Sequence, residues 1–92
     1  MYVILVYDIS IDSGGQKVLR NVFKICKKYL IHIQNSTFEG ELAPSQIFQL
    51  KNELKKHIRK DKDSVIVFKS RSKKWLDKEF WGKEEDVTSV FI

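Results

Sequence analysis

The first apolar run of the chain leaves few folds open. Residues 2–8 have the sequence YVILVYD, in which β-branched and aromatic residues follow one another without a polar position before Asp8. Such a run predicts a strand that is buried on both faces. Asp12 and the pair Gly14-Gly15 then supply signals for a turn and for the start of a helix. A fold for this chain must therefore cover both faces of its first strand.

The remaining apolar patterns alternate between the period of a helix and the period of a strand. From Lys17 to Leu30 the apolar residues have the spacing of an amphipathic helix, and Pro44 is typical of the first position of another helix. We expect strands at 2–8, 65–68 and 87–92, two short strands or one bent strand within 31–42 (turn signal at Asn35-Ser36), and helices at 17–30 and from Pro44 to about the charged run at 60–63. This order predicts an α+β, ferredoxin-like βαββαβ antiparallel sheet with two helices on one face and a C-terminal extra strand.

The length of the chain, 92 residues, fits a single domain. We expect one ferredoxin-like domain over residues 1–92, with a core at 1–70 and a C-terminal extension at 71–92. The one cysteine, Cys26, excludes a disulfide framework, and its position on the apolar face of a helix predicts a core thiol. The opening apolar run is too short for a signal-peptide core or a membrane span. We therefore expect a cytoplasmic protein that does not act at a membrane.

The predicted sheet conflicts with the predicted layer of helices. In a ferredoxin-like fold the helices cover one face, so central strands are expected to alternate apolar and polar residues. Residues 2–7 and 65–68 are instead apolar on both faces. A second copy of the same chain is the simplest cover for the other face, which predicts a symmetric homodimer packed sheet to sheet.

Asp8 is the candidate for chemistry because it ends an otherwise apolar strand. Strand alternation places Asp8 on the same face as Tyr2, Ile4 and Val6. If that face meets the partner, two copies of Asp8 approach each other across the two-fold axis. Two carboxylates, together with water and phosphate oxygens, would suffice to hold Mg²⁺. The alternative is that Asp8 only ends the strand and caps the following turn, and periodicity alone favours this alternative.

The distribution of charge indicates a polyanionic partner. The chain has 17 Lys and Arg against 12 Asp and Glu, a net charge of +5. Residues 16–30 contain five bases and no acid, and residues 51–74 contain ten bases against three acids. Solvated lysine-rich helix faces are common, but two such clusters favour nucleic-acid binding. The helix-face residues that we expect to contact nucleic acid are Lys17, Arg20, Lys24 and Lys28.

Three further side chains allow both a functional and a structural interpretation. His32 could contact a phosphate or transfer a proton, although such a histidine is more often a half-exposed strand residue. Trp75 and Trp81 could stack on bases, but we expect them to fix the C-terminal segment to the sheet.

Three blocks of the sequence resemble the CRISPR-associated protein two family, the small subunit of the spacer-acquisition machinery. These blocks are MYVILVYDIS, HIQNSTFEGELAPSQ and DSVIVFK. The resemblance implies a ferredoxin-like homodimer in which Asp8 is a magnesium ligand and the key residue for phosphodiester hydrolysis. Arg20 falls where the family has a basic residue in its first helix. Residues that the resemblance would place at or near the cleft between protomers are Tyr7, His32 and Phe38.

What is known of the family implies two functions. Some members are magnesium-dependent endonucleases that cut single-stranded RNA or double-stranded DNA. Others act as a non-catalytic bridge between two dimers of the integrase subunit, CRISPR-associated protein one, while binding DNA. We expect a component of CRISPR spacer acquisition that binds nucleic acid as a dimer, with Mg²⁺-dependent endonuclease activity at Asp8. A ferredoxin-like regulatory module that binds a small ligand, or only a protein, is the alternative from a different class.

Overall fold

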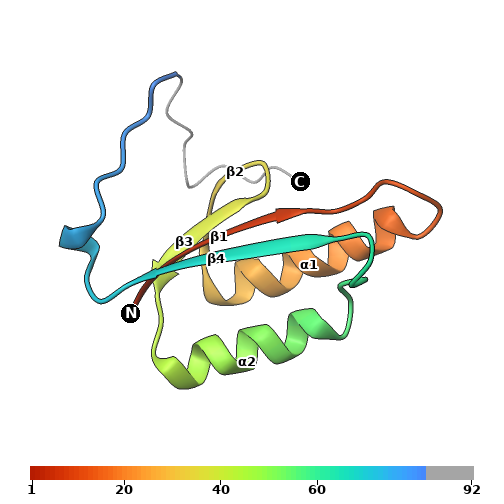
Figure 1. Ribbon diagram of the computed structural model, residues 1–92, viewed down its shortest axis with the longest axis horizontal. Helices are drawn as coiled ribbons and strands as arrows, with labels where there is room; N and C mark the ends of the chain where they lie inside the picture. The colour runs from red at the N-terminus through yellow and green to blue at the C-terminus, as the bar shows by residue number, and fades with distance from the viewer. Residues whose placement is uncertain (83–92) are drawn as a thin grey trace.

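A computed structural model of the chain describes residues 1–82. It contains a four-stranded antiparallel sheet, with both helices on one face (Figure 1). The elements are β1 (Tyr2–Asp8), α1 (Gly15–Tyr29), β2 (Ile31–Gln34), β3 (Thr37–Glu41), α2 (Pro44–Lys55), β4 (Ser64–Ser70) and a short 3₁₀ helix, η1 (Lys73–Trp75). No helix among these residues is long and apolar enough to cross a membrane.

The strand order β2-β3-β1-β4 is the ferredoxin-like order that the alternation of apolar patterns predicts. The apolar strand β1 is central and pairs with β3 and β4, with Leu5 opposite Phe38 on one side and Val67 on the other. The predicted C-terminal strand at 87–92 lies outside the described residues.

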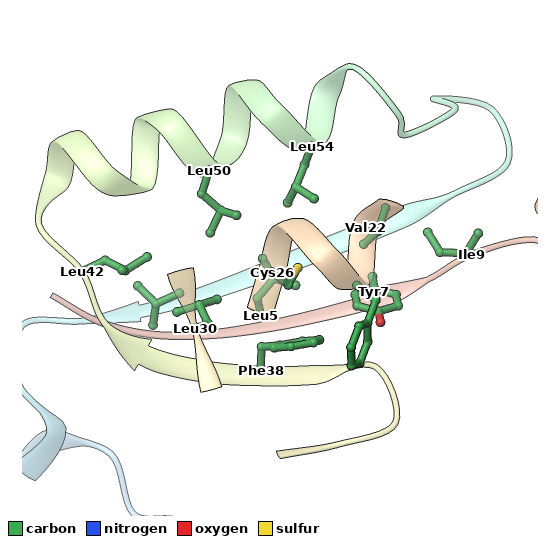
Figure 2. Close-up of a cluster of buried hydrophobic side chains, with 12 residues drawn as sticks. Leu5, Tyr7, Ile9, Val22, Cys26, Leu30, Phe38, Leu42, Leu50 and Leu54 are labelled. Carbon is green, nitrogen blue, oxygen red and sulfur yellow. The ribbon is translucent and has the colours of Figure 1, made fainter. Parts of the chain in front are cut away.

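The core lies between the sheet and the two helices. Val3, Leu5 and Tyr7 point from β1 toward the helices, as alternation along the strand requires. The other fully or almost fully buried side chains of this layer include Val22 and Cys26 of α1, Phe38 of β3 and Leu50 and Leu54 of α2 (Figure 2). Burial raises the pKa of the Cys26 thiol to about 12, so Cys26 is the core thiol that its helical position predicts.

Local chemistry sets the ends of the elements. The loop before α1 is tight: a Cβ on Gly15 would lie 2.1 Å from the carbonyl oxygen of Ser10, so only glycine fits there. Asn35 has a positive φ of 37° and makes the turn between β2 and β3, which are therefore two short strands. Pro44 begins α2 as predicted. The helix ends at Lys55, before the charged run at 60–63, and the chain then continues as turns.

The other face of the sheet carries exposed apolar side chains. The side chains of Ile66 and Phe68 on β4 are 52% and 57% exposed, while those of Ile4 and Val6 on β1 are half-buried. Within residues 1–82, therefore, the helix side of β1 is fully buried, whereas on the other face Tyr2 is buried but Ile4 and Val6 are only partly covered. We call the apolar side chains of this face, Ile4, Val6, Ile66 and Phe68, the open-face patch. It is the surface for which the sequence predicts a covering partner.

The segment after β4 is attached differently from the prediction. Trp81 does not fix it to the sheet, because its side chain is 93% exposed and its indole N–H donates to Glu79 at 2.9 Å. Lys78 of the same segment forms an ion pair with Glu39, a carboxylate of β3 that is largely buried. The prediction is therefore wrong for Trp81, and a charged pair joins this segment to the sheet.

Candidate active site and nucleic-acid interface

Asp8 is the last residue of β1 and its side chain is exposed. It lies opposite Ser64, the first residue of β4. Because Val3, Leu5 and Tyr7 point into the core, the alternation of β1 leaves Asp8 on the face of Ile4 and Val6. Within residues 1–82 the carboxylate makes no hydrogen bond or ion pair, so its oxygens are available to a ligand.

Tyr7 and Phe38 do not accompany Asp8. Both side chains are buried, at 4% and 0% exposure, and their rings stack in the core at a centroid distance of 6.1 Å. Burial, with a smaller contribution from Cys26, raises the pKa of Tyr7 to about 12. Phe38 pairs with Leu5, and the side chains of Tyr7, Leu5 and Phe38 all face the helices. Their expected position near a cleft between protomers stays a prediction.

His32 also lies on the helix side of the sheet. It pairs with Phe38 in the register of β2 and β3, and its ring contacts Phe38 at 4.9 Å and Phe23 of α1 at 5.0 Å between centroids. Its Nε2 lies 2.8 Å from the carbonyl oxygen of Asn35. His32 is thus a half-buried strand residue that stabilises the β2–β3 turn, and it is on the other side of the sheet from Asp8.

The basic residues of α1 form a stripe on the exposed side of that helix. Lys17, Arg20 and Lys24 are exposed and lie opposite the buried Val22 and Cys26. The fourth member of the stripe, Lys28, is paired with Glu53 of α2. The stripe is therefore on the helix side of the molecule, whereas Asp8 is on the open face. One chain does not bring the two predicted sites together.

The residues around Asp8 limit the metal that one chain can hold. Among residues 1–82 there is no group of three or more His, Cys, Asp or Glu side chains placed to bind a metal ion. A single exposed carboxylate fits Mg²⁺, which commonly takes one or two carboxylates and completes its shell with water and phosphate oxygens. It does not fit a metal that needs a complete protein cage.

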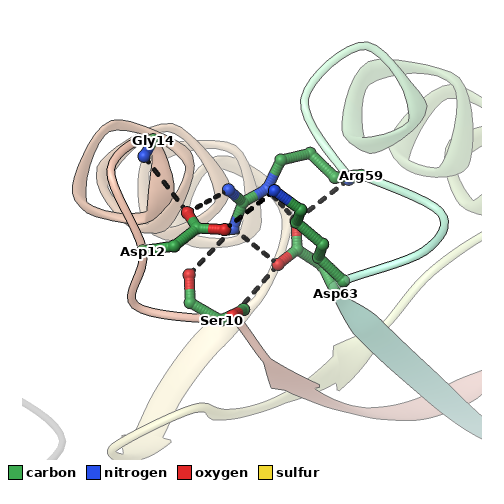
Figure 3. Close-up of polar contacts among 6 residues, drawn as sticks. Ser10, Asp12, Gly14, Arg59 and Asp63 are labelled. Carbon is green, nitrogen blue, oxygen red and sulfur yellow. Dashed lines mark hydrogen bonds and ion pairs between the residues drawn. The ribbon is translucent and has the colours of Figure 1, made fainter.

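A cluster of charged side chains that no sequence pattern indicated joins the loop after β1 to the segment before β4. Arg59, after α2, forms ion pairs with Asp63 and with Asp12 of the β1–α1 loop (Figure 3). The i,i+4 spacing of Arg59 and Asp63 was the available signal, but it lies in a charged run that is typical of a solvated surface. The contact with Asp12 spans 47 residues, and no local pattern reports it.

Comparison with known proteins decides the family. A sequence profile described as CRISPR associated protein Cas2 matches residues 1–78. The chain belongs to the Cas2 family. A CRISPR-associated endoribonuclease Cas2 from Fusobacterium nucleatum is 54% identical over 92 residues, which cover 100% of this chain and 87% of that protein. The names of such Cas2 relatives support nuclease activity, the hydrolysis of phosphodiester bonds.

Solved Cas2 structures have the same fold as this chain. A crystal structure described as cas2 superposes with a TM-score of 0.80 at 35% identity, and the match covers 100% of this chain and 98% of that one. The crystal structure of Streptococcus pyogenes Cas2 superposes with a TM-score of 0.73 at 28% identity, covering 87% of this chain and 100% of that one. The ferredoxin-like fold that the sequence predicts is thus confirmed.

Proposed function

We propose that this Cas2-family chain is a Mg²⁺-dependent endonuclease that acts in CRISPR spacer acquisition and binds nucleic acid as a homodimer. The observation that carries the proposal is the exposed carboxylate of Asp8 at the end of β1, on the face that bears the open-face patch. The relatives' name, endoribonuclease, supports RNA as the substrate. Single-stranded RNA is therefore the first substrate that we propose, and double-stranded DNA is the alternative.

The proposed homodimer would supply two things that one chain lacks, a cover for the open-face patch and a second carboxylate. Packing of two open-face patches against each other would remove Ile66 and Phe68 from water, at about 25 cal/mol for each Å² of apolar surface buried. A symmetric interface uses the same surface of both protomers, and the proposal places its two-fold axis near the end of β1, so that the two copies of Asp8 approach each other. The pair then provides two carboxylates for one substrate phosphate.

The role of Asp8 in this proposal is to hold Mg²⁺ against the scissile phosphate. Bound there, the metal would neutralise charge on the phosphate and lower the pKa of an attacking water. A rigid strand end is suited to this task, because the ladder with Ser64 fixes the backbone from which the carboxylate projects.

Nucleic-acid binding is assigned to the stripe of α1. Three of its side chains, Lys17, Arg20 and Lys24, make no ion pair within the described residues and are available to phosphates. Phosphate contacts release counterions, so affinity is expected to fall steeply as salt is raised. In a dimer with Asp8 at the interface, the two stripes lie on the outer helix layers.

The test of catalysis compares wild type with Asp8→Asn on single-stranded RNA and on duplex DNA, with Mg²⁺ and with EDTA. We expect cleavage that requires Mg²⁺ and is lost in Asp8→Asn, while RNA and DNA binding is retained. Cleavage that survives the substitution would remove Asp8 from the mechanism.

A second candidate is a non-catalytic bridge that holds DNA between two dimers of the integrase subunit. The separation of the basic stripe from Asp8 favours it, because the surface to which we assign phosphate contacts is not beside the proposed metal ligand. Substitution of Lys17, Arg20 and Lys24 by Gln distinguishes the two. The bridge predicts a reduced salt dependence of DNA binding and no cleavage by any variant, whereas the enzyme predicts cleavage that is weakened through substrate affinity.

A further inference from the structure

The guanidinium of Arg59 joins the two loops at the Asp8 end of the sheet. Its Nε donates to Oδ2 of Asp63 at 2.9 Å, and its Nη2 donates to Oδ1 of Asp63 at 2.9 Å. The same Nη2 donates to the carbonyl oxygen of Ser10 at 2.8 Å, and Nη1 donates to Asp12 (Figure 3). We call these four residues the Arg59 clamp.

The two carboxylates of the clamp are held by more than Arg59. Asp63, whose side chain is fully buried, accepts the backbone N–H of Ser10 at 3.0 Å and that of Arg59 at 2.9 Å. Asp12 accepts the backbone N–H of Gly14 at 3.1 Å. Such a network fixes backbone positions on both sides of it, because each carboxylate bonds main-chain donors as well as the guanidinium.

The position of the clamp in the chain connects it to Asp8. Ser10 follows Asp8 by two residues, and Asp63 directly precedes Ser64, which lies opposite Asp8 in the β1–β4 ladder. The clamp therefore ties the chain just after Asp8 to the chain just before its cross-strand partner. The close packing of Ser10 against Gly15 leaves this loop little room to shift.

We propose that Arg59 is a positioning residue that holds the β1 strand end, and through it the Asp8 carboxylate, in the geometry that Mg²⁺ and substrate require. This inference rests on the proposed function of Asp8. Arg59 does this through Ser10 and Asp63 rather than by contact with the metal. Lysine cannot replace it, because a single ammonium cannot reproduce the fork that bonds Asp63 through two nitrogens while reaching Ser10 and Asp12.

The test uses the full-length chain and the variants Arg59→Lys and Arg59→Gln beside wild type and Asp8→Asn. Cleavage of single-stranded RNA is measured as a function of RNA and of Mg²⁺, at a temperature where each variant is folded by circular dichroism. We expect both Arg59 variants to lower kcat about 10- to 100-fold, the range found when residues supporting a metal ligand are lost. The Mg²⁺ concentration for half-maximal rate rises, and the Kd for RNA is unchanged.

The matched control is a substitution near the other end of β1. Glu41 pairs with the amino group of Met1 at 2.8 Å, beside the start of β1 and far along the strand from Asp8. Glu41→Gln removes that ion pair and is expected to leave kcat and the Mg²⁺ dependence as in wild type. An equal loss in Glu41→Gln would mean that strand stability alone is measured, and would overturn the proposal.

Amide hydrogen exchange gives a readout that does not depend on cleavage. Loss of the clamp is expected to speed exchange at Ser10 and at the β1–β4 pair Asp8 and Ser64, and Arg59→Lys allows this measurement even if Arg59→Gln does not fold. Unchanged exchange there, or wild-type kcat in Arg59→Lys while Asp8→Asn is inactive, overturns the proposal alone. Absence of Mg²⁺-dependent cleavage by the wild type would instead overturn the proposed function, and this inference with it.

Discussion

Single residues in this chain take their role from the face of the sheet on which they lie. Asp8 and Tyr7 are neighbours in sequence, yet the carboxylate of Asp8 is exposed on the open face and the ring of Tyr7 is buried among the core residues. Adjacent residues of a strand point to opposite faces of the sheet, so a shift of one position along β1 separates the candidate site from the core.

The Arg59 clamp gives the chain a predictable response to acid. The guanidinium of Arg59 lowers the pKa of Asp63 to about 2, from an ordinary value of 3.8. The carboxylate therefore contributes to stability above about pH 4, and this contribution is lost as the pH falls toward 2. We expect Asp63→Asn to be less stable than wild type to urea at pH 7, and the difference to shrink between pH 4 and pH 2.

The control for this prediction is Asp61→Asn, which removes an exposed carboxylate two residues away. It is expected to leave the urea midpoint unchanged at both pH values. A difference between wild type and Asp63→Asn that stays constant from pH 7 to pH 2 would contradict the assignment of the lowered pKa to Asp63.

At the scale of elements, α2 has half of a capping box at its start. The side-chain oxygen of Gln46 accepts the backbone N–H of Ala43 at 2.8 Å, but Ala43 has no side-chain acceptor to return the bond. Ala43→Ser supplies that acceptor and is expected to raise the free energy of unfolding by about 1 kcal/mol. Urea denaturation measures the gain, and Ala43→Val, which adds carbon but no acceptor, is expected to show none.

The elements were largely predictable from the sequence, and the contacts between them were not. Local periodicity was enough for β1, α1 and the start at Pro44, because those patterns depend on neighbouring residues. The burial of Phe38 was not predictable from the resemblance, which identifies a residue but not the face of the sheet on which its side chain lies. Strand β2 also contains an irregularity between His32 and Gln34 that interrupts simple alternation. The Arg59 clamp was missed for the complementary reason: its partners are far apart in sequence.

At the scale of the whole molecule, the open-face patch predicts the association state. Phe68→Glu places a charge among Ile4, Val6 and Ile66, which a sheet-to-sheet dimer would have to bury unpaired. We expect sedimentation at micromolar concentration to show a dimer for wild type and a monomer for this variant. The matched control is Phe48→Glu on α2, where the wild-type side chain is 66% exposed on the helix side.

A dimer that persists in Phe68→Glu and dissociates in Phe48→Glu would place the interface on the helices. A wild-type chain that is monomeric throughout would remove the second carboxylate from the proposed metal site. Either result would leave the fold and the Arg59 clamp as they are described.

The position of β4 at the edge of the described sheet affects how readily the protein aggregates in a cell. Within residues 1–82 its outer side presents unpaired backbone groups beside Ile66 and Phe68. Exposed apolar edges of this kind are templates for aggregation and are recognised by quality control. Sheet-to-sheet pairing of two copies would cover Ile66 and Phe68 but leave this edge free. A further strand or segment that pairs with β4 is therefore expected to lower the aggregation of the protein in a cell.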